Sequence, residues 1–154
     1  MADKRYLKTK FWRDPYTKRN LNTMSERIIY TFLLLNEDTS QCGVFEIMYE
    51  DIAEQTLASL EEVAAAMAKL EADGKIQYDH ETKEVFIVNY MKHNPPTSPK
   101  MQTNMLKDMA VVKSKALLAL WHEEMKAIGL DVNAATNTPN PNIKGLVDHY
   151  NEAY

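Results

Sequence analysis

Apolar and polar positions in the first half of the chain follow the period of amphipathic helices. Residues 23–26 (TMSE) and 59–62 (SLEE) each match the capping box, in which a Ser or Thr and a Glu three positions later cap a helix N-terminus. We therefore expect one helix over residues 23–35. A second helix should begin at residue 59 and end at Gly74, a natural C-cap.

The second of these helices is predicted to have one buried face and one outward face. Its apolar positions recur with the spacing of a single helical stripe. They are Leu60, Val63, Ala64, Met67 and Leu70. The outward face would then consist of Glu61, Glu62, Ala65, Ala66, Lys69, Ala72 and Asp73.

Short apolar runs around these helices predict strands. Residues 43–47 are typical of a short strand, and residues 49–56 of a helix. Residues 75–78 and 85–90 are rich in β-branched and aromatic side chains and flank a short polar connection, which predicts a hairpin. The order is that of a winged helix-turn-helix with a β-hairpin wing. The fold class is therefore mainly α (α+β), with this domain over residues 1–94.

A proline-rich stretch separates this unit from a predicted long helix over residues 100–128, within a second unit of residues 95–130. Residues 131–154 read as a linker-like tail with a candidate short helix. The long helix carries a heptad-like stripe of two heptads, widened by Leu120 and Trp121. The stripe comprises Met105, Met109, Val112, Ala116 and Ala119. It either packs on the winged helix of its own chain or builds an oligomer.

Residues 4–12 alternate loosely and are predicted to form a short strand or an extended arm, which Pro15 ends by opening a short helical turn. The whole chain has 154 residues, with 18 basic and 22 acidic side chains and a net charge of -4. The first 20 residues carry a net charge of +5 and residues 21–94 carry -9. This basic arm either binds a partner or folds back onto the acidic body.

Several functional classes lack the residues that they need. The single Cys42 excludes a disulfide framework and a multi-cysteine zinc site. The chain has no Gly-rich phosphate loop, and its four histidines lack metal-ligand spacing; His122 opens a zinc-protease-like pattern that has Lys126 where the second His is required. We expect a cytoplasmic, non-enzymatic protein without cofactor or metal, and with neither a secretory signal nor a membrane span.

Several short segments, in order, carry a resemblance to a known family. They are FWRDPY at residues 11–16, LLLN at 33–36, GVFE at 43–46, LEADGKI at 70–76, VFIVN at 85–89, and Lys92 with His93. This set resembles the N-terminal winged-helix domain of phage and prophage replication initiation proteins, the DnaD-like replisome organisers. The resemblance implies origin DNA binding, self-association, recruitment of a helicase loader and a location in the cytoplasm of a bacterial host cell. Relatives often have Gly where this chain has Leu57, and they are often longer.

Basic side chains that could neutralise DNA phosphates lie mainly in the arm and around the hairpin. The candidate DNA-binding residues are Lys4, Arg5, Lys8, Lys10, Arg13, Lys18, Arg19, Lys69, Lys75, Lys83, Lys92 and Lys100. The outward face of the residue 59–74 helix offers mainly Ala and Glu to base edges, so we expect contacts that position the protein rather than read sequence. Aromatic side chains interleaved with the arm either stack on unpaired bases or pack within the protein. They are Tyr6, Phe11, Trp12 and Tyr16.

Three functions remain open at this point. The first is a phage-type replication initiation protein that binds DNA with low sequence specificity and assembles through its helices. The second is a winged-helix transcription regulator, and the third is an interaction adaptor that does not contact DNA. The candidate oligomer or partner interface is Ala65, Ala66, Met105, Met109, Val112, Ala116, Leu120 and Trp121.

Overall fold

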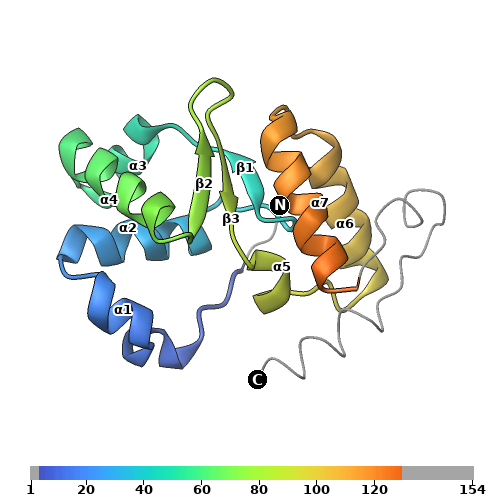
Figure 1. Ribbon diagram of the computed structural model, residues 1–154, viewed down its shortest axis with the longest axis horizontal. Coiled ribbons are helices and arrows are strands. Elements are labelled where there is room, and N and C mark those ends of the chain that lie inside the picture. Colours follow the sequence, from blue (N-terminus) through green and yellow to red (C-terminus); the bar gives the residue numbers. More distant parts are fainter. Residues whose placement is uncertain (1–3, 130–154) are drawn as a thin grey trace.

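The computed structural model describes residues 4–129, which form a mainly helical α+β fold with a small antiparallel sheet (Figure 1). In chain order the elements are the 3-10 helix η1 (Thr9–Arg13), α1 (Pro15–Asn20), α2 (Met24–Leu35), β1 (Val44–Glu46), α3 (Tyr49–Thr56), α4 (Leu60–Ala72), β2 (Ile76–Asp79), β3 (Glu84–Ile87), α5 (Tyr90–His93), α6 (Pro99–Ala110) and α7 (Lys115–Ala127). The tail over residues 131–154 lies outside the described residues.

Both capping boxes are confirmed. In α2 the backbone N–H of Glu26 donates to Thr23 Oγ1 at 3.1 Å, and the N–H of Thr23 donates back to the Glu26 carboxylate at 3.2 Å. In α4 the N–H of Glu62 donates to Ser59 Oγ at 3.1 Å, and the reciprocal bond is 3.2 Å. These bonds satisfy backbone donors that the helix itself cannot pair, which is why both starts were readable from the sequence.

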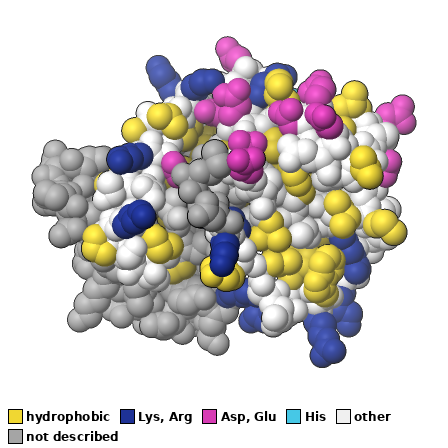
Figure 2. Space-filling view, turned by 180° about the vertical axis from the view of Figure 1, so that it is seen from behind, with side chains coloured by type: hydrophobic (Ala, Val, Ile, Leu, Met, Phe, Trp, Pro, Cys, Tyr) yellow, Lys and Arg dark blue, Asp and Glu magenta, His cyan; other side chains and the backbone are white. Residues whose placement is uncertain are grey.

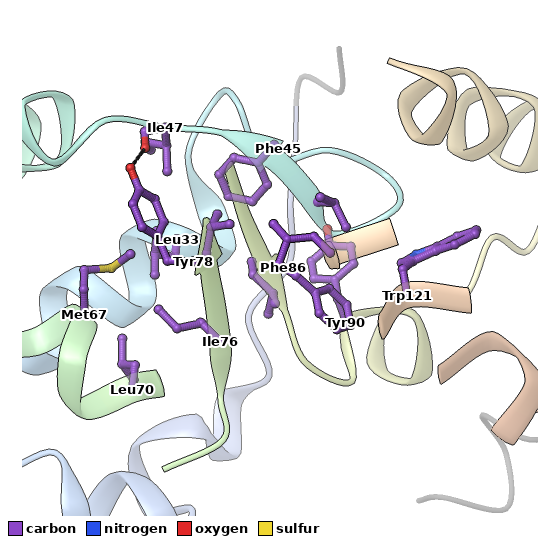
Figure 3. Packing of buried hydrophobic residues seen from close by; sticks show 14 of the residues in the cluster. Leu33, Phe45, Ile47, Met67, Leu70, Ile76, Tyr78, Phe86, Tyr90 and Trp121 are labelled. Carbon is purple, nitrogen blue, oxygen red and sulfur yellow. Dashed lines mark hydrogen bonds between the residues drawn. The ribbon is translucent and has the colours of Figure 1, made fainter. Parts of the chain in front are cut away.

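The sheet has the strand order β1-β3-β2, with all neighbours antiparallel. Figure 1 shows α2, α3 and α4 on one side of this sheet and α6 and α7 on the other. All four residues of the central strand β3 are buried, because helices cover both of its faces. The hydrophobic core therefore continues through the sheet, from Leu33 and Met67 on one side to Trp121 on the other (Figure 3).

The buried face of α4 differs from the predicted one. Leu60 is 52% exposed and Ala64 is also exposed, whereas Ala66, expected to face outward, is 1% exposed. The buried positions of α4 are Val63, Ala66, Met67 and Leu70. The helix is rotated relative to the prediction because its many alanines make several stripes almost equally apolar.

Contacts with α2 explain this rotation. Ser25 Oγ donates to the Glu62 carboxylate at 2.6 Å, and Lys69 Nζ lies 3.3 Å from the carboxylate of Glu26. The line of α4 that contains Glu62, Ala66 and Lys69 therefore faces α2 of the same chain. Lys69 is consequently used in an internal ion pair rather than presented to a partner.

The N-terminal arm contains no strand, so of the two predicted alternatives, a short strand or an extended arm, the strand is wrong; residues 4–8 belong to no helix or strand. Residues 9–13 form the 3-10 helix η1, with the N–H of Phe11 donating to the Lys8 carbonyl at 2.9 Å. Pro15 occupies the first turn of α1 as expected, and the N–H of Tyr16 donates to Asp14 Oδ2 at 3.0 Å. The arm has no strand neighbour to pair with among the described residues, and it folds against α2 through ring contacts between Phe11 and Tyr30.

The predicted long C-terminal helix is two helices, α6 and α7, that break at residues 111–114. Ser114 caps α7 by accepting from the N–H of Leu117 at 3.2 Å. The Glu84 carboxylate of β3 accepts from the N–H groups of Lys113 and Ser114 at 2.8 and 2.7 Å. A buried carboxylate thus satisfies the backbone donors at the break and fixes the start of α7 against the sheet.

Because of this break, the expected heptad-like stripe does not run along one continuous helix. Met105 and Trp121 are 0% exposed and belong to the core of their own chain, so a partner cannot reach them. Met109 and Val112 are half-buried against the same core. Ala116 and Leu120 are exposed, as is Ala65 on α4. Of the two alternatives for this region, packing on the rest of the chain is the one that the structure shows.

Candidate nucleic-acid interface

Charge is unevenly distributed over the surface. Figure 2 shows Asp and Glu side chains along the upper edge and a cluster of Lys and Arg at the lower right. Because Figure 2 is seen from behind, this corner corresponds to the lower left of Figure 1, where η1 and α1 lie. The last turns of these two helices carry Lys10, Arg13, Lys18 and Arg19. We call this part of the surface the basic end. The charge difference expected from the sequence is therefore also a separation in space.

A cavity of about 370 Å³ lies beside the basic end, between residues 6–17 and residues 87–94. A second cavity of about 350 Å³ shares part of its wall with the first, including Tyr6, Lys8 and His93. We call the first cavity the arm cleft. Its aromatic lining consists of Tyr6, Phe11, Tyr16, Tyr30 and Tyr90, and its basic lining of Lys8, Lys10, Lys75 and His93. Asp14 also lines it.

Hydrogen bonds and ring contacts fix the walls of the arm cleft. Tyr16 Oη donates to the Asp73 carboxylate at 2.9 Å, and Lys75 Nζ lies 4.2 Å from the centroid of the Tyr16 ring. Tyr16 and Tyr30 meet edge to face at 6.2 Å. Burial raises the pKa of Tyr30 to about 12, and burial together with the Asp73 bond raises the pKa of Tyr16 further. Both phenols are therefore neutral at physiological pH.

Positive charges converge on the arm cleft. Burial, then the neighbouring charges of Lys8, Lys92 and Lys75, lower the pKa of His93 below its usual value. Burial, then the charge of Lys10, also lowers the pKa of Lys8. Burial is the larger cause for both groups, and the neighbouring lysines add to it. The arm cleft therefore has several basic groups close together in its wall.

Other basic candidates have internal roles or lie elsewhere. Arg5 donates to the Thr39 carbonyl at 2.5 Å and to Gln41 Oε1 at 3.3 Å, so its guanidinium anchors the arm to the loop before β1. Lys83 is exposed in the turn of the β2–β3 hairpin, away from the basic end, and Lys100 is exposed in the first turn of α6. Lys4 is exposed near the start of the described chain. The structure does not gather these four with the rest.

Several residues of the cleft wall were not identified from the sequence, among them Tyr30, Tyr90 and Asn94. Tyr30 on α2 and Tyr90 on α5 look like core residues because each lies within an apolar run. Asn94, next to a proline pair, also lines the cleft. In the sequence, basic and aromatic side chains alternate along the arm. This pattern indicated the arm as part of a site, but it did not indicate the residues against which the arm packs.

Helix α5 forms one wall of the cleft, and the partly buried carboxylate of Glu124 holds it in place. The N–H of Asn89, which has a left-handed backbone (φ 62°), donates to Glu124 Oε1 of α7 at 2.5 Å. Glu124 Oε2 is buried without a hydrogen-bond partner among the described residues. Burial raises the pKa of Glu124 to about 6, against the lowering effects of the Asn89 bond and the Lys92 charge.

This raised pKa predicts a pH-dependent effect of the Glu124→Gln substitution. The folded state disfavours the ionised carboxylate, so its cost is present above pH 6 and disappears as the pH falls towards the ordinary value of 4.5. Because the group is partly solvated, we expect Glu124→Gln to raise the free energy of unfolding by about 1 kcal/mol at pH 8. Urea unfolding at pH 8 and pH 4.5 measures this. A variant that is destabilised by the same amount at both pH values contradicts it.

Comparisons with protein-family models, curated proteins and solved structures found no match to this chain. Within residues 4–129, no group of three or more His, Cys, Asp or Glu side chains is placed to hold a metal ion. No helix in that part of the chain is long and apolar enough to span a bilayer.

Proposed function

We propose that this chain is a winged-helix DNA-binding protein of the replication-initiation type, which holds DNA through its basic end with low sequence specificity. The order from α2 to β3 and the strand order β1-β3-β2 support the winged helix, because in that fold the first strand pairs with the second strand of the wing. In a winged helix of this order, α3 and α4 would form the helix-turn-helix. Leu57 between them has a left-handed backbone (φ 63°), the conformation for which relatives use Gly.

The composition of α4 supports phosphate contacts over base readout. Its exposed positions are Leu60, Glu61, Glu62, Ala64, Ala65, Ala68 and Ala72. None of these side chains is a cationic or amide donor for base edges, and the glutamates repel phosphates. This disfavours the transcription regulator. The convergence of basic side chains at η1, α1 and the arm cleft is the observation that carries the proposal, because such contacts bind DNA without specifying its sequence.

The adaptor remains the second candidate, and the acidic upper edge in Figure 2 favours it. In that case the basic end would bind an acidic protein rather than DNA. Within the replication proposal, the partners are a helicase loader and further copies of this chain. Exposed Ala65, Ala116 and Leu120 are the members of the candidate interface that such a partner could reach.

The test compares two charge reversals of equal size. Lys18→Glu/Arg19→Glu alters the exposed last turn of α1, and Lys115→Glu/Lys126→Glu alters exposed positions of α7 on the other side of the sheet. Fluorescence anisotropy with a mixed-sequence duplex at about 50 and 200 mM salt gives the affinity and its salt slope. We expect the α1 pair to weaken binding at least about tenfold and to reduce the salt slope by about two, one for each lost phosphate contact.

The α7 pair controls for net charge, because both variants change the total charge by the same amount. Circular dichroism should show both to be folded, since all four side chains are exposed. Equal losses in the two variants would mean that only total charge matters and would contradict a localised interface. If the wild-type chain binds no duplex even at the lower salt concentration, the interaction adaptor is the candidate function that remains.

A further inference from the structure

We propose that the arm cleft binds one unpaired nucleotide of single-stranded DNA, with the base among its aromatic rings and the phosphate beside its basic side chains. The inference deepens the proposed function and rests on it, since both concern DNA. It adds a second mode of contact, because the phosphate contacts at α1 do not distinguish a duplex from a single strand, whereas the cleft does.

The shape of the cleft supports a planar ligand. Its volume of about 370 Å³ is that of a small-molecule site rather than a groove for a helix. Rings reach it from four elements: Phe11 from η1, Tyr16 from α1, Tyr30 from α2 and Tyr90 from α5. Aromatic faces stack on bases of any sequence. A paired base cannot enter such a hollow without leaving its stack, so the site selects unpaired nucleotides.

Tyr6 is the side chain that marks this site most clearly. It is 83% exposed, yet it lines both the arm cleft and the adjoining second cavity. The ring therefore adds little to the hydrophobic core and is accessible beside both cavities. Arg5, next in the chain, is fixed to the Thr39 carbonyl, so the backbone that presents Tyr6 is held in place. Tyr6 is therefore positioned to cover a base that enters the cleft.

The charges of the cleft suit the phosphate of the same nucleotide. Lys8, Lys10 and Lys75 line the cavity that the rings line, so a base and its phosphate can be bound together. The pKa values of His93 and Lys8 are lowered first by burial and then by the charges of neighbouring lysines. Asp14 is the acidic group in the lining, and its carboxylate accepts the N–H of Tyr16. Three lysines therefore line the cleft beside this carboxylate.

The experiment measures a labelled oligothymidine single strand and a labelled mixed-sequence duplex with the full chain and two aromatic variants. Tyr6→Ala removes the ring at the cleft, and Trp12→Ala removes another exposed ring of the arm that does not line the cleft. We expect Tyr6→Ala to weaken single-strand binding by about 5- to 100-fold and duplex binding by less than about twofold. Trp12→Ala should leave both unchanged, and Tyr6→Phe should retain single-strand binding.

A second measurement reports on the base itself. A single strand with one 2-aminopurine should lose fluorescence when the wild-type chain binds, because stacking on a ring quenches it, and Tyr6→Ala should abolish this change. Lys10→Ala should weaken the binding of the single strand more than the binding of the duplex. Lys18→Ala, outside the cleft, should weaken the binding of both equally.

The outcomes separate the two proposals. If the wild-type chain binds duplex through α1 but Tyr6→Ala binds the single strand as tightly as wild type, the cleft inference is wrong and the proposed function stands. Equal effects of Tyr6→Ala and Trp12→Ala also overturn the cleft. If the wild-type chain binds neither DNA, both proposals are wrong.

Discussion

Replacement of Trp121 by Ala is expected to lower the free energy of unfolding by about 3–5 kcal/mol. Trp121 is 0% exposed on α7, and its Nε1 donates to the Cys42 carbonyl at 2.9 Å. The substitution removes a large buried ring, leaves a cavity and deprives a buried carbonyl of its donor. Because a domain of this size is typically stable by only about 5–15 kcal/mol, the loss should be a large part of the total.

Urea unfolding followed by far-ultraviolet circular dichroism measures this loss. Leu120→Ala provides the control, since Leu120 precedes Trp121 on the same helix but is 39% exposed. We expect it to cost less than about 1 kcal/mol. If the two substitutions have similar effects, α7 is not held to the sheet by Trp121.

The second large effect is expected for Gly43→Ala, which should cost about 2–4 kcal/mol. Gly43 has φ +80°, and a Cβ built there would lie 2.6 Å from Cβ of Tyr90. The backbone cannot move aside freely, because the Gly43 carbonyl accepts from the N–H of Ile87 at 2.9 Å. The variant therefore combines a strained backbone with a clash against a buried side chain.

Gly74→Ala separates these two causes. Gly74 has φ +71°, but a Cβ there would have no neighbour within 4 Å. This variant should show the backbone cost alone, about 1 kcal/mol. Thermal and urea unfolding of both variants give the difference, which is the cost of the contact with Tyr90. Equal losses would mean that Tyr90 moves away without penalty.

Local signals in the sequence predicted the starts of the elements well. Thr23 and Ser59 each cap a helix with a Glu three residues later, and this chemistry needs no distant residue. The hairpin was also predicted, because two β-rich runs flank a short polar connection. Sequence reading was weaker for the orientation of α4: with Ala at 64, 65, 66 and 68, composition alone does not decide which side faces α2.

Features that depend on distant residues were missed. The heptad-like stripe concealed the break before α7, although Ser114 is a good N-cap residue, because the carboxylate that completes the cap comes from Glu84 on β3. The arm cleft has the same origin, since Tyr30 and Tyr90 lie 60 positions apart and meet the arm only in the folded chain. The residue types within one segment do not predict such contacts between distant segments.

The position of Cys42 makes one movement of this molecule directly observable. Its thiol is 0% exposed, burial raises its pKa, and its carbonyl accepts the indole N–H of α7. Alkylating reagents attack the thiolate, so they should reach this sulfur only when the packing around it opens, and α7, whose indole N–H binds the Cys42 carbonyl, is part of that packing. As the chain has one cysteine, the alkylation rate by mass spectrometry counts such openings without a label. Trp121→Ala should accelerate that reaction before it unfolds the protein.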